Sequence, residues 1–391
     1  MKFRHLTLLI LFVSAQLMGQ NKTIDSLSNL LLDSTDPSEK IALRCKISQR
    51  YVEIGDFRQG QIIAETALKE ATELGDKMGK GQAFYSLARL NQYMRDWDNA
   101  LLYQYQAIQL FDEINAIEEL AWSYLNMGIA FEAKEEYDRA IRYTTKALEA
   151  FKKIKHKQGE AYSYLNLGYP LHEKGETEAA LEKLEAAKRI CEEINDHTGI
   201  GYVHNIKGDI YFQTGNLDQA LEENKACIEI RLNENNRRDF AILYGRIGKI
   251  YLLKNELKKA EEALRLAEKS SLEIQANLEL RDLYLTWSKL DSAQGDFKLA
   301  YEHHKSFHSN AEIILKEERE REEVAIKYAL NKEIESLEAR EAEIIKEYEA
   351  KLAECQEAAA DNSKELLLFA AAGIILLLTV VVVKQKRRVK S

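Results

Sequence analysis

The chain has 391 residues and a formal net charge of −9, and basic residues dominate its two ends. The acidic remainder would repel nucleic acid, so a nucleic-acid partner is disfavoured. Only two prolines occur, which is typical of a nearly all-helical protein.

Two short elements are predicted at the beginning of the chain. Residues 1–19 combine a basic start, a short apolar run and a small-residue exit, which predicts a secretory signal peptide. In residues 20–36 the apolar positions Ile24, Leu27, Leu30 and Leu31 follow helical spacing. We expect this segment to form an N-terminal capping helix over the first unit of the repeat that follows.

Residues 37–310 contain an internal repeat of about 40 residues. Within residues 122–155, apolar residues three and four apart predict two amphipathic helices joined by a polar turn. Three columns of small residues recur through the repeat: Ala88, Gly128, Gly168, Gly208, Gly248 and Ser288; Gly60, Ala100, Ala140, Ala180, Ala220, Ala260 and Ala300; and Ala67, Ala107, Ala147, Ala187, Cys227 and Ala267, with Phe307 as the one large exception in the third column. Small residues are needed where helix axes approach closely. A turn column rich in Gly, Asn and Asp predicts left-handed and capping geometry between the helices.

The repeat resembles the tetratricopeptide repeat. The shared pattern is an aromatic residue, then leucine and glycine, a second aromatic residue, and two alanines seven residues apart. The pitch departs from the usual length of about 34 residues, and the usual proline after the second helix is absent. The resemblance implies an all-α, right-handed α-solenoid of about seven helical hairpins. Pro170 falls inside a first helix, where we expect either a kink or a tolerated irregularity.

The resemblance also implies that a peptide or protein segment binds along the inner surface, mainly on the first helix of each unit. Gln82 and Tyr85 lie in the matching columns. The candidate binding residues are Arg89, Trp122, Asn126, Tyr162, Asn166, Tyr169, Tyr202, Asn205, Arg246 and Lys249. Aromatic side chains give rigid contact area, and Asn or Arg can bond a peptide backbone or carboxylate. Helix packing alone would also use these side chains, so both roles remain open.

The sequence shows no motif for catalysis or for metal binding. No phosphate loop, nucleophile elbow or zinc-protease helix occurs, and the cysteines lack metal-ligand or redox spacing. Cys45, Cys191 and Cys227 are expected to be buried. His303, His304 and His308 form the one dense histidine group in the sequence. Only His304 and His308, four residues apart, share a helix face, and two ligands are too few for a metal site. We predict no enzymatic activity, no catalytic residue, no cofactor and no metal.

Residues 311–365 form a charged segment with sparse apolar residues at three- and four-residue spacing. This pattern predicts a coiled-coil stalk, although Glu341 interrupts its apolar stripe. A lone charged helix is the alternative. If two stalks pair in parallel, Cys355 would face its copy and could form an interchain disulfide.

Residues 366–383 are eighteen successive uncharged residues and predict one transmembrane helix. The basic tail 384–391 satisfies the positive-inside rule. Together with the signal peptide, this predicts a single-pass protein of the bacterial cell envelope. Its repeats would be extracytoplasmic, in the periplasm, and its C-terminus cytoplasmic.

The order of these segments resembles the sensory half of bacterial membrane-bound tetratricopeptide regulators, which carry a histidine kinase or helix-turn-helix output domain after the span. Only eight residues follow the predicted span here. We therefore expect a membrane-anchored sensor or scaffold in envelope signalling, with a protein or peptide ligand, a stalk-mediated homodimer and a separate cytoplasmic output protein. A purely structural envelope tether or assembly factor is the main alternative, and an undetected enzyme is the third.

Overall fold

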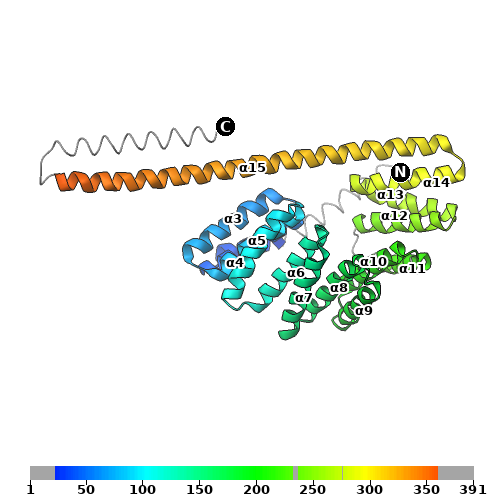
Figure 1. Cartoon of the computed structure of the whole chain (residues 1–391), viewed down its shortest axis with the longest axis horizontal. Helices are drawn as coiled ribbons and strands as arrows, with labels where there is room; N and C mark the ends of the chain where they lie inside the picture. Colours follow the sequence, from blue (N-terminus) through cyan, green and yellow to red (C-terminus); the bar gives the residue numbers. More distant parts are fainter. Residues whose placement is uncertain (1–22, 232–236, 275, 360–391) are drawn as a thin grey trace. The chain divides into compact units, whose positions relative to one another are not determined.

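The computed structural model describes residues 23–231, 237–274 and 276–359, and within these it consists of helices (Figure 1). Residues 23–33 form a first helix. The following helices are α2 (Pro37–Glu53), α3 (Phe57–Leu74), α4 (Lys77–Tyr93), α5 (Trp97–Glu113), α6 (Ile117–Ala133), α7 (Tyr137–Lys153), α8 (Lys157–Glu173), α9 (Thr177–Glu193), α10 (His197–Gln213), α11 (Leu217–Arg231), α12 (Arg237–Leu253), α13 (Leu257–Glu273), α14 (Asn277–Gln294) and α15 (Phe297–Ala359). The predicted all-α class is confirmed.

The helices pair into hairpins from α2–α3 to α12–α13, and His303 at the start of α15 packs against Tyr284 and Trp287 of α14. Each hairpin contacts the next, and the first helices of neighbouring units touch from α2 through α10 and between α12 and α14. Contacts therefore run between near neighbours in sequence, which defines a repeat solenoid. The chain divides into two units, Met1–His303 and His304–Ser391, so the solenoid belongs to the first and most of α15 to the second.

The columns of small residues lie where the helices approach each other. Ala140, Ala147, Ala180 and Ala187 are completely buried. At Gly168, an added Cβ would lie only 2.7 Å from Cδ2 of Leu184 on the paired helix. The hairpin geometry thus depends on the absence of side-chain bulk at these positions, as the sequence predicted.

Most described junctions use a three-residue turn, and two residues join α3 to α4 and α14 to α15. The turn both ends a helix and begins the next. At the α4–α5 turn, the backbone N–H of Asp96 donates to the carbonyl of Asn91 at 2.9 Å, while its carboxylate accepts from the N–H of Asn99 at 3.1 Å. The first bond closes a Schellman motif and the second caps the new helix. Because the same turn recurs, successive helices begin twenty residues apart.

The residue before this cap has a left-handed backbone at every described junction where its angle is recorded. Gly and Asn occupy several of these positions, as predicted, but Arg95, Glu135 and Lys155 have positive φ angles of 60°, 60° and 55°. Left-handed backbone is unfavourable for residues with a Cβ by about 1–2 kcal/mol. The repeated turn imposes this conformation even where the side chain disfavours it.

Lys155→Gly is expected to raise the free energy of unfolding by about 0.5–1 kcal/mol, because glycine adopts this backbone without steric conflict. Chemical denaturation followed by circular dichroism would measure the shift. Lys155→Ala is the control, since it removes the charge but keeps the Cβ. Equal stability of the two variants would contradict the explanation.

Gln104 is among the buried polar side chains that the packing leaves without a hydrogen bond. Gln104 is 1 % exposed, and neither its amide nitrogen nor its oxygen has a hydrogen-bond partner among the described residues. Leu184 and Leu264 occupy the same position in later units and are completely buried. A buried polar group without a partner destabilises the fold by about 1–3 kcal/mol.

Leu184 and Leu264 face Gly168 and Gly248, whereas residue 104 faces Ala88. In a chain with Ala88→Gly, Gln104→Leu should therefore stabilise the solenoid by about 1–3 kcal/mol, since it removes the unsatisfied amide and keeps a similar volume. The reciprocal change Leu184→Gln should destabilise it. Both are measured as shifts of the denaturation midpoint. If Gln104→Leu destabilised the Ala88→Gly chain, the explanation by an unsatisfied amide would be wrong.

Helices also form at the two ends of the described chain. In the helix of residues 23–33, Ile24 is buried, but Leu30 is 53 % exposed, so only part of the predicted apolar stripe is covered. α15 continues without interruption through residue 311, because neither a glycine nor a left-handed residue ends it. α8 likewise runs through Pro170 as one helix.

Among the described residues, no helix is long and apolar enough to cross a membrane. The predicted signal peptide, residues 366–383 and the basic tail lie outside the described residues.

Candidate functional site

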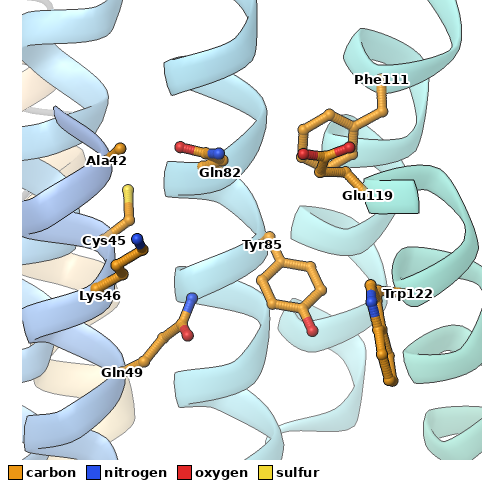
Figure 2. Close-up of a pocket in the computed structure, with 9 residues that line it drawn as sticks. All are labelled: Ala42, Cys45, Lys46, Gln49, Gln82, Tyr85, Phe111, Glu119 and Trp122. Atoms are coloured by element: carbon orange, nitrogen blue, oxygen red, sulfur yellow. The ribbon is translucent and has the colours of Figure 1, made fainter. Parts of the chain in front are cut away.

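A cavity of about 480 Å³ lies between the first helices of the first three units. Its lining residues come from α2, α4, α5 and α6: Ala42, Cys45, Lys46, Gln49, Gln82, Tyr85, Phe111, Glu119 and Trp122 (Figure 2). The lining is largely apolar, with polar groups at separate points. This combination is typical of small-ligand and peptide sites.

The aromatic side of the cavity is firmly held. Figure 2 shows the Tyr85 ring projecting from α4 toward Trp122 on α6. The Trp122 ring packs edge-on against Phe151, with ring centroids 4.8 Å apart, and against His156 at 5.7 Å. Burial raises the pKa of Tyr85, so its hydroxyl remains protonated and able to donate. Trp122 and Tyr85 therefore offer a preformed surface with one polar tip.

The polar groups of this cavity differ in how far they are already engaged. Nε2 of Gln49 donates to Oγ of Ser86 at 3.2 Å. The side chains of Gln82, Lys46 and Glu119, in contrast, have no hydrogen bond or ion pair within the described part of the chain. Burial raises the pKa of Cys45 to about 12, which keeps it a neutral, unreactive thiol.

A second cavity of about 220 Å³ lies between α10, α12 and α14. Two predicted residues, Arg246 and Lys249, line it together with Asp209, Glu279 and Asp282. Nη1 of Arg246 donates to Oδ1 of Asn205 at 3.1 Å, and its Nη2 lies 3.3 Å from Asp209. Arg246 is therefore held by internal partners, and its predicted role in ligand binding remains a prediction.

The structure separates the predicted residues into several environments. Trp122 lines the first cavity, and Arg246 and Lys249 line the second. The other residues make local contacts: Arg89 with Glu53 at 3.7 Å, Asn166 with the carbonyl of Tyr162 at 2.7 Å, Tyr169 with the Tyr137 ring at 6.5 Å, and Tyr202 beneath the guanidinium of Arg231 at 4.4 Å. The buried side chain of Asn126 lies beside the Tyr85 hydroxyl and interacts with it. A binding role for these residues remains a prediction.

The sequence prediction missed the polar residues of the first cavity on α2 and α6. Ala42 and Gln82 precede Trp122, Tyr162 and Tyr202 in one column of the repeat. The first two units have a small or polar residue in this column and the next three have an aromatic ring. The inner surface can therefore be hollow at the first two units, where the ring is missing. That signal is present in the sequence, but the repeat alone does not show that Phe111 closes the cavity from α5.

A buried charged cluster replaces apolar packing in the fifth unit. Lys207 occupies the column of Met127, Leu167 and Ile247 but is 8 % exposed. Its Nζ lies 2.7 Å from both Glu185 and Glu223. Burial alone would lower the pKa of Lys207, but its interactions with the two carboxylates are stronger, so the pKa of Lys207 is raised. A buried set of this kind stabilises little, but it becomes costly once a partner is removed.

No metal site is visible in the described part of the chain. Nε2 atoms of His304 and His308 approach to 3.3 Å, whereas Nδ1 of His303 lies 2.6 Å from Asp291. Among the described residues, no group of three or more His, Cys, Asp or Glu side chains is placed to hold a metal ion. Cys45, Cys191 and Cys227 are buried and free, as predicted. The side chain of Cys355 is outside the described residues.

Glu132 occupies, on α6, the repeat position at which Phe212 lines the second cavity. Burial raises its pKa to about 7. The folded state therefore binds a proton that the unfolded state has already released above its ordinary pKa of about 4.5. Stability should thus fall as the pH rises from about 4.5 to 7 and then level off.

Glu132→Gln should remove this pH dependence and raise the stability above pH 7, by an amount on the order of 3 kcal/mol. The preceding unit already has Gln92 at this position, so the change suits the fold. Denaturation midpoints between pH 4 and 8 would measure the effect. Glu149→Gln, an exposed carboxylate on α7, is the control, and an unchanged pH profile in Glu132→Gln would refute the assignment.

The comparisons with known proteins agree with this geometry. One tetratricopeptide-repeat family model matches residues 119–193, and another matches residues 202–234 and 241–273. A search of curated proteins finds no match. The chain therefore contains tetratricopeptide repeats, as its sequence predicted.

Several solved structures share the fold at low sequence identity. A Rap protein complexed with Competence and Sporulation Factor matches with a TM-score of 0.56 and 15% identity, covering 76% of this chain and 81% of that chain. NprR in complex with its cognate peptide NprX gives 0.53 and 16%, with 73% and 82% covered. A signal-transduction ATPase with a tetratricopeptide-repeat sensor from Pyrococcus horikoshii gives 0.57 and 19%, with 74% and 45% covered. At these identities the likeness shows a helical repeat solenoid.

Proposed function

We propose that this chain is a membrane-anchored, extracytoplasmic repeat protein that recognises a protein or peptide segment through its first helices. The observation that carries the proposal is the cavity of about 480 Å³ on α2, α4 and α6. Its aromatic rings are fixed by packing against neighbouring side chains, and several of its polar side chains have no hydrogen bond or ion pair among the described residues. This combination suits a peptide, which brings both apolar and polar groups.

The solved structures give this proposal context. The Rap protein structure contains Competence and Sporulation Factor, and the NprR structure contains its cognate peptide NprX. A solenoid of the same fold can therefore hold a peptide. We extend this role to the present chain because its inner surface contains a cavity with appropriate chemistry.

Membrane anchoring, periplasmic location and stalk pairing are proposals from the sequence. Residues 366–383 would span the membrane, and the charged segment would pair as a coiled coil with Cys355 near its copy. The continuous α15, from Phe297 to Ala359, would connect the repeats to the span. A ligand-dependent rearrangement of this connection would make the protein a sensor or scaffold, with a separate protein receiving the signal. The proposal is of a binding protein and not an enzyme.

A photo-reactive amino acid at Gln82 in intact cells should crosslink one recurrent protein or peptide, because Gln82 lines the cavity without an internal partner. The adducts would be identified by mass spectrometry. The same residue at Glu149, exposed on the second helix of the third unit, is the matched control and should not give this adduct.

Equal labelling from both positions, or no specific adduct from Gln82 in a folded protein, would contradict ligand recognition. That outcome would favour the structural tether, for which the uninterrupted α15 would serve as a spacer.

A further inference from the structure

The first cavity exists because two positions of the inner surface lack large side chains. Ala42 and Gln82 occupy the column in which the next three units place Trp122, Tyr162 and Tyr202. Phe111, which is 1 % exposed, closes the cavity from α5. The aromatic column thus ends at this cavity. Its lining residues Tyr85 and Trp122 can pack against an aromatic ring of a ligand.

The two sides of the hollow carry opposite charges. Lys46 projects from α2 on one side and Glu119 from α6 on the other, with Gln82 of α4 between them (Figure 2). Within the described residues, neither charge has an ion-pair partner. Both charges are therefore available to a ligand, and their separation by a whole helix prevents one charged group from engaging them together.

The amide of Gln82 adds a hydrogen-bonding group at the centre. It has no side-chain partner among the described residues, whereas Gln49 is bonded to Ser86 at 3.2 Å. An amide can donate to and accept from a peptide backbone at once. An acyl chain could use the aromatic lining, but it would gain nothing from Gln82 and Glu119.

We propose that this cavity anchors one aromatic side chain of a linear peptide whose flanking residues have opposite charges. The acidic flank lies beside Lys46, the basic flank beside Glu119, and Gln82 bonds the backbone at the anchor. This inference rests on the proposed function and specifies the ligand chemistry of its site.

The test is selection of a randomised nonapeptide library on the purified full-length chain. The expected result is a motif with a central Phe, Tyr or Trp, an acidic residue on one side and a basic residue on the other. Fluorescence anisotropy with a labelled selected peptide then measures the affinity of each protein variant.

Ala42→Tyr should weaken binding at least about tenfold, because the ring occupies the anchor position. The substitution suits the fold, since Tyr162 and Tyr202 fill this column in later units. Leu102→Tyr, at an exposed position of α5, is the matched control and should bind normally. Circular dichroism melting would establish that both variants are folded.

Lys46→Glu should weaken binding of the same peptide by about three- to fivefold, as expected for the loss of a contact between exposed charges. Replacing the acidic residue of the peptide by Lys should restore binding to this variant and weaken binding to the unmodified protein. This exchange distinguishes a direct contact from a loss of folding.

The outcomes separate the inference from the function on which it rests. If the selected peptides bind the Ala42→Tyr and Lys46→Glu variants with unchanged affinity, the proposed aromatic anchor is wrong. Peptide recognition would then take place elsewhere on the solenoid. Failure to select any peptide, despite a specific protein adduct from Gln82 in cells, would overturn the linear-peptide ligand. Failure of both experiments would overturn both proposals.

Discussion

Close approach of paired helices is the constraint on which the solenoid depends. Ala140 and Ala147 are completely buried, and an added Cβ at Gly168 would lie 2.7 Å from a Leu184 methyl group. Side chains at these positions would separate the helices and remove the contacts of every neighbouring side chain. Since each unit contacts mainly its neighbours, the same local condition repeated along the chain is enough to build the fold.

The turns transmit this regularity from one hairpin to the next. The shared use of Asp96 as the end of one helix and the cap of another keeps the helix spacing constant. Lys155 shows that the turn geometry is stronger than the preference of a single residue, because it has a φ angle of 55°. With spacing and packing both fixed, equivalent positions of successive first helices lie along one surface. A cavity on that surface can therefore combine residues from three units.

Polar groups divide the inner surface into parts with different chemistry. Near α2, α4 and α6, charged and amide side chains remain available beside aromatic rings. Near α10 and α12, Arg246 is held by Asn205 and Asp209, and the charged Lys207 forms ion pairs with neighbouring carboxylates. The first region is thus better suited to an external ligand, since its groups need not give up internal partners on binding. The second region joins neighbouring helices of the solenoid itself.

The sequence by itself determined the helices, their pairing and the crossing positions, because small and turn residues act over a single 40-residue unit. It also placed Trp122 and Lys249 in columns that line cavities. Only the tertiary structure decided that Lys46 and Glu119 border one hollow, since that requires three units to be brought together. It likewise decided that Arg246 is occupied, because a column specifies the position of a side chain but not its partners.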